Sequence, residues 1–421
     1  MNKKWFRLDN IGRLYASIAN YRDTTMFRLS AVFKEEVDPA ILGAALQNVM
    51  PRFPYFATHV KRGIFWYYIE ENTEIPVPTE ERYFPCMHYQ VKKKGNFPFR
   101  VLYYKRRLSV EFTHIITDGT GGLIFLQTLI REYVRLMKKE TATNEELQRP
   151  GKDVLADEVE DSFSKYYKKG YPASKKGGKA FHLPYKLLPK GVFHVVTGTV
   201  ELADIKRLSK EKGVTITEFL IGVYFKTILD RIEKKGYKKR PVVLNVPANL
   251  RLLYPSKTMR NFFAPITPML DPRLGTYSFD EILRYVKNFM EMQVDKKYMD
   301  QIISRNVKNE RHWILRTFPV FIKDLIMPWI YHFYGERGYT SGFSNVGLVS
   351  LGEELEKEVE SVHVYPAPSS GNIIKVTCVG FKGKIHITFG KLTLEKELER
   401  EFFRNLVEMG MEVMIETNLE G

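Results

Sequence analysis

The sequence contains few cysteines and no long uninterrupted apolar run. Its two cysteines, Cys86 and Cys378, lie far apart and in no paired motif, which excludes a disulfide framework and favours a reducing compartment. The first residues lack the apolar core of a signal peptide. The most apolar segment, Phe318 to Tyr334, is interrupted by two charged residues and a proline, and it is too short to span a bilayer. We therefore expect a cytoplasmic protein without a transmembrane segment, in which this segment forms a buried or surface-lying helix.

The signatures of several common enzyme classes are also absent. No Gly-x-Ser-x-Gly turn is present, which argues against a serine hydrolase. The chain has neither a phosphate loop ending in Gly-Lys-Ser/Thr nor a Gly-x-Gly-x-x-Gly turn after a strand, so it lacks the signatures of enzymes that bind nucleotides through such loops. The nine histidines are scattered, and His88, His194 and His386 fall in strand-like runs, where we interpret them as packing residues.

Acidic residues are outnumbered by basic ones. The 65 Lys and Arg against 49 Asp and Glu give a formal net charge of +16, which favours an anionic partner such as nucleic acid, anionic lipid, an acidic carrier protein or a phosphorylated small molecule. Nucleic-acid binding would require basic residues interleaved with stacking aromatics on a recognisable module, and we find none. We therefore predict no nucleic-acid partner. A steep salt dependence of nucleic-acid affinity would contradict this.

The length of 421 residues predicts two domains of similar size. Strand and helix signals alternate in both halves, which indicates an α/β protein with layered sheets and helices. Residues 1–140 form the predicted N-terminal domain, 141–185 a charged crossover or linker, and 186–421 the C-terminal domain. The last of these is expected to close with an amphipathic helix over residues 395–415.

One stretch combines a histidine with both a strand and a helix signal. Residues 99–112 predict a β-hairpin whose second strand ends just before His114. Apolar residues then recur at helical spacing over residues 123–136. Asp118 and Gly119 open this helix, where an acidic side chain suits the free N–H groups. Loops at strand ends commonly display catalytic side chains.

Three interpretations of His114 and Asp118 remain open on the residues alone. The histidine could be a core residue followed by an N-capping aspartate. The two could belong to a metal site, although no third ligand with suitable spacing lies nearby, so we predict no metal. The histidine could instead be a general base whose loop the aspartate holds. The glycines at 119, 121 and 122 are expected to let the helix pack closely under the histidine loop.

The pattern His-x-x-x-Asp-Gly between a strand and a helix resembles the HxxxD-type acyl-CoA-dependent acyltransferase superfamily, which includes chloramphenicol acetyltransferase, the plant alcohol acyltransferases and the condensation domains of peptide synthetases. Further segments resemble the same superfamily in order and spacing across nearly the whole chain. These are Phe27-Arg28-Leu-Ser with Arg52-Phe53-Pro54, Pro247-Ala-Asn249-Leu-Arg251 with Asn261-Phe-Phe, and Ser344-Asn345-Val-Gly347.

Two differences from this pattern indicate which branch of the superfamily the chain resembles. Thr113 stands where many relatives have a first histidine, as it does in the bacterial alcohol acetyltransferase-like branch, so the chain resembles that branch more than a peptide-synthetase condensation domain. The Asp-Phe-Gly-Trp-Gly segment of the plant members is also absent.

The resemblance implies two chloramphenicol acetyltransferase-like subdomains, each a mixed sheet with flanking helices, and an active-site tunnel between them. His114 would lie at the middle of the tunnel and act as general base on an alcohol or amine that attacks a thioester, in a ternary complex without a covalent acyl-enzyme. Asp118 would pair with Arg251 and hold the histidine loop, with a simple helix cap as the alternative.

The remaining site residues are candidates of different kinds. Ser344 or Asn345 would donate a hydrogen bond to the oxyanion of the tetrahedral intermediate, unless Asn345 only holds its own turn. Lys257 and Arg260 are candidates for the phosphates of coenzyme A on charge alone.

We expect no tightly bound cofactor, with acyl-CoA (acetyl-CoA among the candidates) as co-substrate, an alcohol or amine as acceptor, and a monomeric protein. An acyl carrier protein is an alternative source of the acyl group, as in a condensation-like enzyme. The alternative from another class is a catalytically inactive binding or scaffold protein with this fold, against which the presence of both His114 and Asp118 counts.

Overall fold

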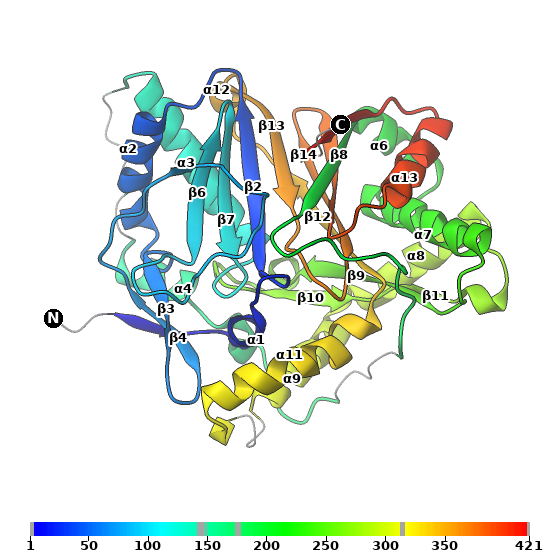
Figure 1. The fold of residues 1–421 in the computed structure, drawn as a ribbon, viewed down its shortest axis with the longest axis horizontal. Helices are drawn as coiled ribbons and strands as arrows, with labels where there is room; N and C mark the ends of the chain where they lie inside the picture. Colours follow the sequence, from blue (N-terminus) through cyan, green and yellow to red (C-terminus); the bar gives the residue numbers. More distant parts are fainter. Residues whose placement is uncertain (1–3, 141–146, 148–149, 173–177, 312–315, 419–421) are drawn as a thin grey trace.

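The computed structural model describes residues 4–140, 147, 150–172, 178–311 and 316–418, and Figure 1 shows two large sheets standing side by side with helices around them. The first sheet has the strand order β13-β2-β7-β6-β5. Its strands are β2 (Met26–Phe33), β5 (Thr79–Glu80), β6 (Phe99–Tyr104), β7 (Arg107–Thr113) and β13 (Val359–Tyr365). Strand β13 comes from the second half of the chain and pairs antiparallel with β2, so the two halves share a sheet.

The second sheet has the strand order β10-β9-β12-β14-β15-β8-β16, with β11 also paired to β9. Strand β12 runs parallel to both of its neighbours. The strands are β8 (His194–Glu201), β9 (Val242–Asn249), β10 (Phe263–Ile266), β11 (Met269–Leu270), β12 (Ser341–Leu348), β14 (Ile374–Phe381), β15 (Lys384–Lys391) and β16 (Met414–Thr417). A small third sheet holds β1 (Trp5–Arg7), β4 (Tyr67–Glu71) and β3 (Thr58–Arg62).

Helices cover both large sheets (Figure 1). Those of the first half are α1 (Asn10–Ile18), α2 (Pro39–Val49), α3 (Gly119–Met137), α4 (Lys152–Glu158) and α5 (Ser162–Lys165). Those of the second half are α6 (Leu202–Glu211), α7 (Ile216–Lys235), α8 (Phe279–Gln293), α9 (Lys296–Glu310), α11 (Val320–Tyr334), α12 (Glu353–Glu356) and α13 (Glu397–Glu408). Short 3-10 turns lie at η1 (Met50–Arg52), η3 (Leu250–Leu252), η4 (Pro272–Leu274) and η5 (Glu336–Gly338).

Each large sheet has a hydrophobic core of its own. One core gathers apolar side chains of β2, β7, α2 and α3, and it includes Val362 and Val364 of β13. The other gathers side chains of α7, α13 and the second sheet. Two cores are expected in a chain of this length, because a single hydrophobic core rarely serves more than about 300 residues. The mixed α/β fold with two subdomains that the sequence predicts is therefore present.

One local expectation needs correction. The predicted closing helix ends at Glu408 rather than near residue 415, because Gly410 has a φ of +87° that turns the chain, and Met414–Thr417 then form β16 on the edge of the second sheet. Part of the predicted linker is regular, since α4 and α5 lie within it. No helix of the described ranges is long and apolar enough to cross a membrane.

A buried ion-pair network crosses the centre of the first sheet. The Arg28 side chain is 1% exposed, and its guanidinium contacts Glu111 at 2.7 Å and Glu81 at 2.6 Å. Glu111 is fully buried and also accepts hydrogen bonds from Arg100 at 2.7 Å and from the backbone N–H of Cys86 at 2.6 Å. Burial raises the pKa of Glu111, but Arg28 and Arg100 outweigh this and hold it below its usual value. The Glu111 carboxylate is therefore a counter-charge for both arginines, and Glu81 is a second one for Arg28.

Replacing Glu111 by Gln would leave Arg28 and Arg100 inside the sheet without this counter-charge. We expect a loss of about 3–5 kcal/mol in the free energy of unfolding, measured by urea denaturation. The matched control is Arg106→Gln, which breaks an exposed pair with Glu360 and should change the same free energy by about 0–1 kcal/mol. Equal losses in the two variants would contradict this account of the network.

Candidate active site

His114 is the first residue beyond β7, where its backbone N–H donates to the carbonyl of Thr25 at 2.9 Å. Its side chain is half-buried, and its ring Nδ1 lies 3.1 Å from the carbonyl oxygen of Thr117. A carbonyl only accepts hydrogen bonds, so Nδ1 carries the proton in this contact. The neutral ring then has its lone pair on Nε2.

Aromatic side chains pack around the imidazole ring. Phe27 stacks on it at 4.4 Å between ring centroids and Tyr15 at 5.5 Å, and Phe263 lies at 6.2 Å. Burial lowers the pKa of His114 to about 4, although the carboxylate of Asp118 and the Thr117 carbonyl act in the opposite direction. The ring is therefore neutral near pH 7, which is the protonation state that a general base requires.

The Asp118 carboxylate joins the histidine loop to the second half of the chain. Its Oδ1 accepts from the backbone N–H groups of Thr120 at 3.0 Å and Gly121 at 3.3 Å, so it caps α3. Its Oδ2 accepts from Arg251 Nη1 at 2.8 Å and from the backbone N–H of Phe262 at 2.9 Å. Both interpretations of Asp118 are thus realised, the helix cap by one oxygen and the predicted pair with Arg251 by the other.

Arg251 itself is held on three sides. It lies in η3, directly after β9, and its Nε donates to the carbonyl of Thr258 at 3.0 Å. Its Nη2 donates to the carbonyl of Arg260 at 2.6 Å, and its Nη1 also reaches Oδ1 of Asn249 at 3.3 Å. A guanidinium with its planar donors satisfied in this way has one orientation, so the position of Asp118 is set by the backbone around β9 and β10.

The segment from Thr258 to Phe262 makes further contacts with the histidine loop. The Thr117 hydroxyl donates to the carbonyl of Met259 at 2.6 Å. The Asn261 amide donates to the backbone carbonyl of His114 at 2.9 Å. This segment therefore contacts the loop at its first residue, at Thr117 and at Asp118, and fixes the direction of the imidazole.

Close packing under the loop depends on glycines other than Gly119. A Cβ atom on Gly121 would lie 2.2 Å from the Thr117 hydroxyl and 2.4 Å from the Met259 carbonyl oxygen, and one on Gly122 would lie 2.9 Å from Leu29. A Cβ on Gly119 would meet no described atom within 4 Å. The prediction of close approach is thus correct for Gly121 and Gly122 and wrong for Gly119, whose backbone is the first turn of α3.

Ser344 and Asn345 lie on β12, opposite Thr377 and Cys378 of β14. The Asn345 amide donates to the Thr217 hydroxyl at 2.9 Å and accepts from the backbone N–H of Gly347 at 2.9 Å. Gly347 has a φ of +88°, so Asn345 holds a turn that glycine permits. The Ser344 hydroxyl has no hydrogen-bond partner among the described residues, and neither side chain forms a hydrogen bond with His114 there.

The two basic candidates differ in accessibility. Lys257 is exposed and lies 3.7 Å from Asp157. Arg260 is buried, where it lies 3.5 Å from Asp9 and donates to the carbonyls of Val159 at 3.1 Å and Arg7 at 2.9 Å. Its charge is already used inside the protein, so the prediction that Arg260 binds coenzyme A phosphates is corrected, whereas Lys257 stays a candidate.

Sequence reasoning missed the stacking residues Tyr15 and Phe27. Both belong to elements far from His114 in sequence, α1 and β2, and an aromatic residue at an amphipathic or strand position carries no signal for a site. A half-buried cation, Lys375, was also missed; it lowers the pKa of His114 further, and its amino group donates to the Ala367 carbonyl at 2.9 Å.

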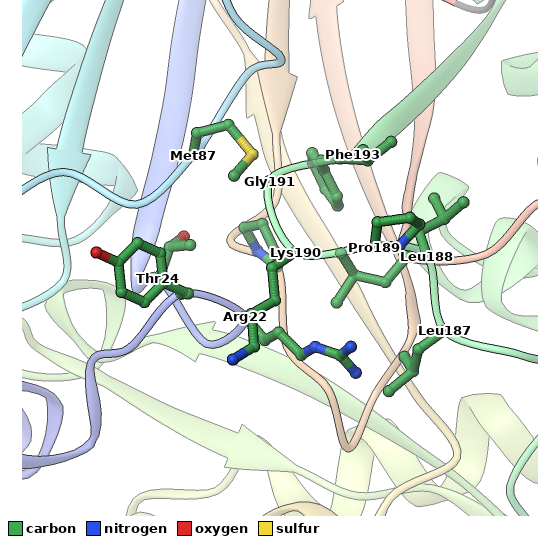
Figure 2. Close-up of a pocket in the computed structure, with 13 residues that line it drawn as sticks. Arg22, Thr24, Met87, Leu187, Leu188, Pro189, Lys190, Gly191 and Phe193 are labelled. Atoms are coloured by element: carbon green, nitrogen blue, oxygen red, sulfur yellow. The ribbon is translucent and has the colours of Figure 1, made fainter.

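A small pocket of about 10 Å³ lies between the loop before β2 and residues 187–193, as Figure 2 shows. Arg22, Thr24 and Met87 line one side of it, and Leu187 and Phe193 lie on the other. That volume is about enough for one water molecule, and His114 is not among the lining residues. The tunnel to His114 therefore remains a prediction. Within the described residues, no group of three or more His, Cys, Asp or Glu is placed to hold a metal ion.

Comparison with solved structures identifies the fold. TRI101 of F. graminearum, crystallised with coenzyme A and T-2 mycotoxin, matches with a TM-score of 0.64 and 11% identity over 98% of this chain and 100% of that one. TRI3 trichothecene 15-O-acetyltransferase of Fusarium sporotrichioides matches at 0.63 and 11%, over 97% and 94%. The condensation domain of the monacolin K polyketide synthase MokA matches at 0.60 and 12%, over 96% of each chain. This is the fold of the CoA-dependent acyltransferase and condensation-domain superfamily.

The match of the acyltransferase fold over nearly the full length of each chain confirms the fold predicted from the resemblance. No protein-family model and no curated protein matches the sequence. The likeness at 11–12% identity is one of fold alone.

Because burial lowers the pKa of His114 to about 4, its imidazole should not titrate between about pH 8 and pH 5. Histidine-selective isotope labelling and NMR measure this, with the resonance assigned by its loss in His114→Gln. In Asp118→Asn the helix cap is kept, but the charge that favours the imidazolium is lost, so the pKa should fall further. Titration of His114 near pH 6.5 would contradict the burial of the ring.

Proposed function

We propose that the protein is an acyltransferase that moves an acyl group from a thioester, acyl-CoA in the first instance, to the hydroxyl or amine of a small acceptor. The observation that carries this proposal is the state of His114. Its Nδ1 proton is held by the Thr117 carbonyl, which leaves the lone pair that can accept a proton on Nε2. The acyltransferase fold of the whole chain makes proton transfer at a thioester the reaction to expect.

In the proposed reaction, Nε2 of His114 takes the proton from the acceptor as its oxygen or nitrogen attacks the thioester carbon. The tetrahedral intermediate then collapses, the carbon–sulfur bond breaks, and the imidazolium returns the proton to the leaving sulfur. One proton moves from acceptor to thiol, and no covalent acyl-enzyme forms. The carboxylate of Asp118 favours the transient imidazolium, since its charge raises the pKa of His114.

Asp118 and Arg251 are positioning residues in this proposal. Their pair at 2.8 Å joins the loop that carries His114 to the region around β9 and β10. Holding a general base in a fixed position beside the reacting atoms of a ternary complex increases the reaction rate. Asp118 needs no contact with substrate to do this.

Ser344 is the better candidate for the oxyanion donor. Both polar ends of the Asn345 amide are engaged by Thr217 and Gly347, whereas the hydroxyl of Ser344 is free of partners among the described residues. A preorganised donor at the developing oxyanion stabilises the transition state more than the ground state. We therefore assign this role to Ser344 and a supporting role in the turn to Asn345.

Coenzyme A is proposed as a co-substrate and not as a resident cofactor. TRI101 was crystallised with coenzyme A, and the net charge of +16 suits a donor that carries several phosphates. Lys257 is an exposed cation of the second half that could meet such a phosphate. The second candidate function is a condensation-like reaction with a donor bound to a carrier protein, which the similarity to the MokA condensation domain favours.

The first experiment is an assay of thiol release from a panel of acyl-CoA thioesters, with and without mixed alcohols and amines. We expect acceptor-dependent release that falls by roughly 100-fold or more in His114→Ala, because the general base is removed. The matched control is His88→Ala, since His88 is also half-buried but packs against the Tyr21 ring outside the site, and it should leave the rate unchanged.

Other outcomes of this assay separate the alternatives. Release from an acylated carrier protein but from no acyl-CoA would select the condensation-like reaction. No release from either donor by the folded protein would favour an inactive scaffold with this fold. Equal rates in wild type and His114→Ala would reject the mechanism.

Ser344→Ala should lower kcat by roughly 10²–10³-fold with little change in KM, because a donor to the oxyanion acts mainly in the transition state. Steady-state kinetics with the best donor and acceptor measure this, and Ser344→Thr, which keeps a hydroxyl, should recover part of the rate. A change confined to KM would instead assign Ser344 to ground-state binding.

A further inference from the structure

Helix α11 (Val320–Tyr334) has the reverse of the usual polarity of a surface helix. Its two charged side chains face the protein: Lys323 donates to the carbonyl of Phe65 at 2.5 Å and lies 3.3 Å from the centroid of the Trp66 ring. Asp324 accepts from the Tyr67 hydroxyl at 2.6 Å. Both contacts are with the hairpin of β3 and β4, so the polar residues hold α11 against that hairpin.

The apolar side chains of this region point outward instead. They recur three or four residues apart, which places them along one face of the helix, and Leu325 is 71% and Trp329 68% exposed. The exposed set is Phe318, Phe321, Leu325, Ile326, Trp329, Ile330 and Phe333. We call these residues the α11 face. The helix spans about 22 Å, since each residue of an α-helix rises 1.5 Å.

The hairpin turn between β3 and β4 continues the α11 face. Ile64 is 75% exposed and Phe65 is exposed as well, and the backbone N–H of Val320 donates to the carbonyl of Ile64 at 2.8 Å. In Figure 1 the start of α11 and this hairpin lie together at one edge of the molecule. Several exposed apolar side chains gathered on neighbouring elements mark an interaction site on a folded protein.

A group of cations lies at the other end of the helix. Arg337 follows α11, stacks over the Phe333 ring at 5.6 Å and lines a shallow open pocket with Trp329, Ile330 and Phe333. The backbone N–H of Ala180 donates to the carbonyl of Arg337 at 3.1 Å and that of Phe181 to the carbonyl of Pro241 at 2.7 Å, so Lys179, Arg240 and Arg337 lie close together. Arg240, Arg337 and Lys238 accordingly lower the pKa of Lys179. Within the described ranges none of the four forms an ion pair. Their positive charges repel one another, and an anion from outside the protein would reduce this repulsion.

We infer that the α11 face and the cations beside it bind the surface of an anionic lipid bilayer, with the helix lying in the plane of the interface. Tryptophan, phenylalanine and leucine on the buried side with basic residues beside them are the composition that such interfacial helices use. Phosphate head groups would meet Lys179, Arg240 and Arg337 while the apolar side chains enter the acyl boundary.

The same helix reaches the candidate active site from its inner side. Tyr331 packs edge-on against Tyr15 at 6.4 Å, and Tyr15 stacks on the imidazole of His114. A bilayer on the α11 face would therefore be separated from His114 by the helix and one ring. Membrane binding does not depend on the proposed acyl transfer, and it can be tested without a substrate.

The test is co-sedimentation of the whole protein with vesicles of phosphatidylcholine alone or mixed with phosphatidylglycerol. We expect binding to the mixed vesicles that weakens with salt and on pure phosphatidylcholine. Leu325→Asp should weaken binding to the mixed vesicles by at least roughly 10-fold, because a charge then enters the acyl boundary. The matched control, Leu274→Asp, changes a leucine of η4 that is 82% exposed outside this face, and it should bind as wild type does.

Lys179→Glu should weaken binding only where the vesicles carry negative charge. Far-ultraviolet circular dichroism and the urea midpoint verify that each variant is folded. Failure of wild type to bind the mixed vesicles, or equal binding by Leu325→Asp, would overturn the inference. So would a dimer in light scattering that Leu325→Asp abolishes without any vesicle binding, since the face would then belong to a second copy of the chain.

Discussion

The site depends on one carboxylate that is shared by two parts of the chain. Oδ1 of Asp118 caps α3, whereas its Oδ2 is bound by Arg251 and by the backbone N–H of Phe262. Arg251 in turn is fixed by two backbone carbonyls. Neither half of the chain alone contains this arrangement, so the direction of the His114 ring is a property of their association. Loss of the charge at Asp118 would leave a half-buried guanidinium with one partner fewer.

The chemistry of His114 follows from the same constraint. The Asn261 amide and Thr117 hold the loop so that Nδ1 meets a carbonyl, and this selects the tautomer with a basic Nε2. The aromatic surroundings remove water and lower the pKa of the ring to about 4. In the proposed reaction, a base that is unprotonated near pH 7 can take the proton from the acceptor as it attacks the thioester.

Much of the fold and part of the site could be predicted from local sequence patterns and from the family resemblance. Asp118 caps α3 through side-chain hydrogen bonds, as the short-range pattern predicts. The pair of Asp118 and Arg251, 133 residues apart, was available only from the resemblance. The pairing of β13 with β2, the stacking of Tyr15 on His114 and the burial of Arg260 were not predictable, since each depends on contacts between distant segments that share no local pattern.

The orientation of helix α11 could not be predicted from the sequence either. The sequence marks Lys323 and Asp324 as interruptions of an apolar run, but it does not say which side faces the protein. Rotation of the helix by half a turn would bury its apolar face and would be favoured by the hydrophobic effect. The contacts of Lys323 and Asp324 with the β3–β4 hairpin and of Tyr331 with Tyr15 oppose that rotation. Burial of Lys323 lowers its pKa to about 8, which means that the observed orientation is held against a desolvation cost. In water, this orientation is unfavourable for both the charged and the apolar side chains. It becomes favourable once an apolar phase covers the outer face of the helix, and this is the physical reason to propose a bilayer there.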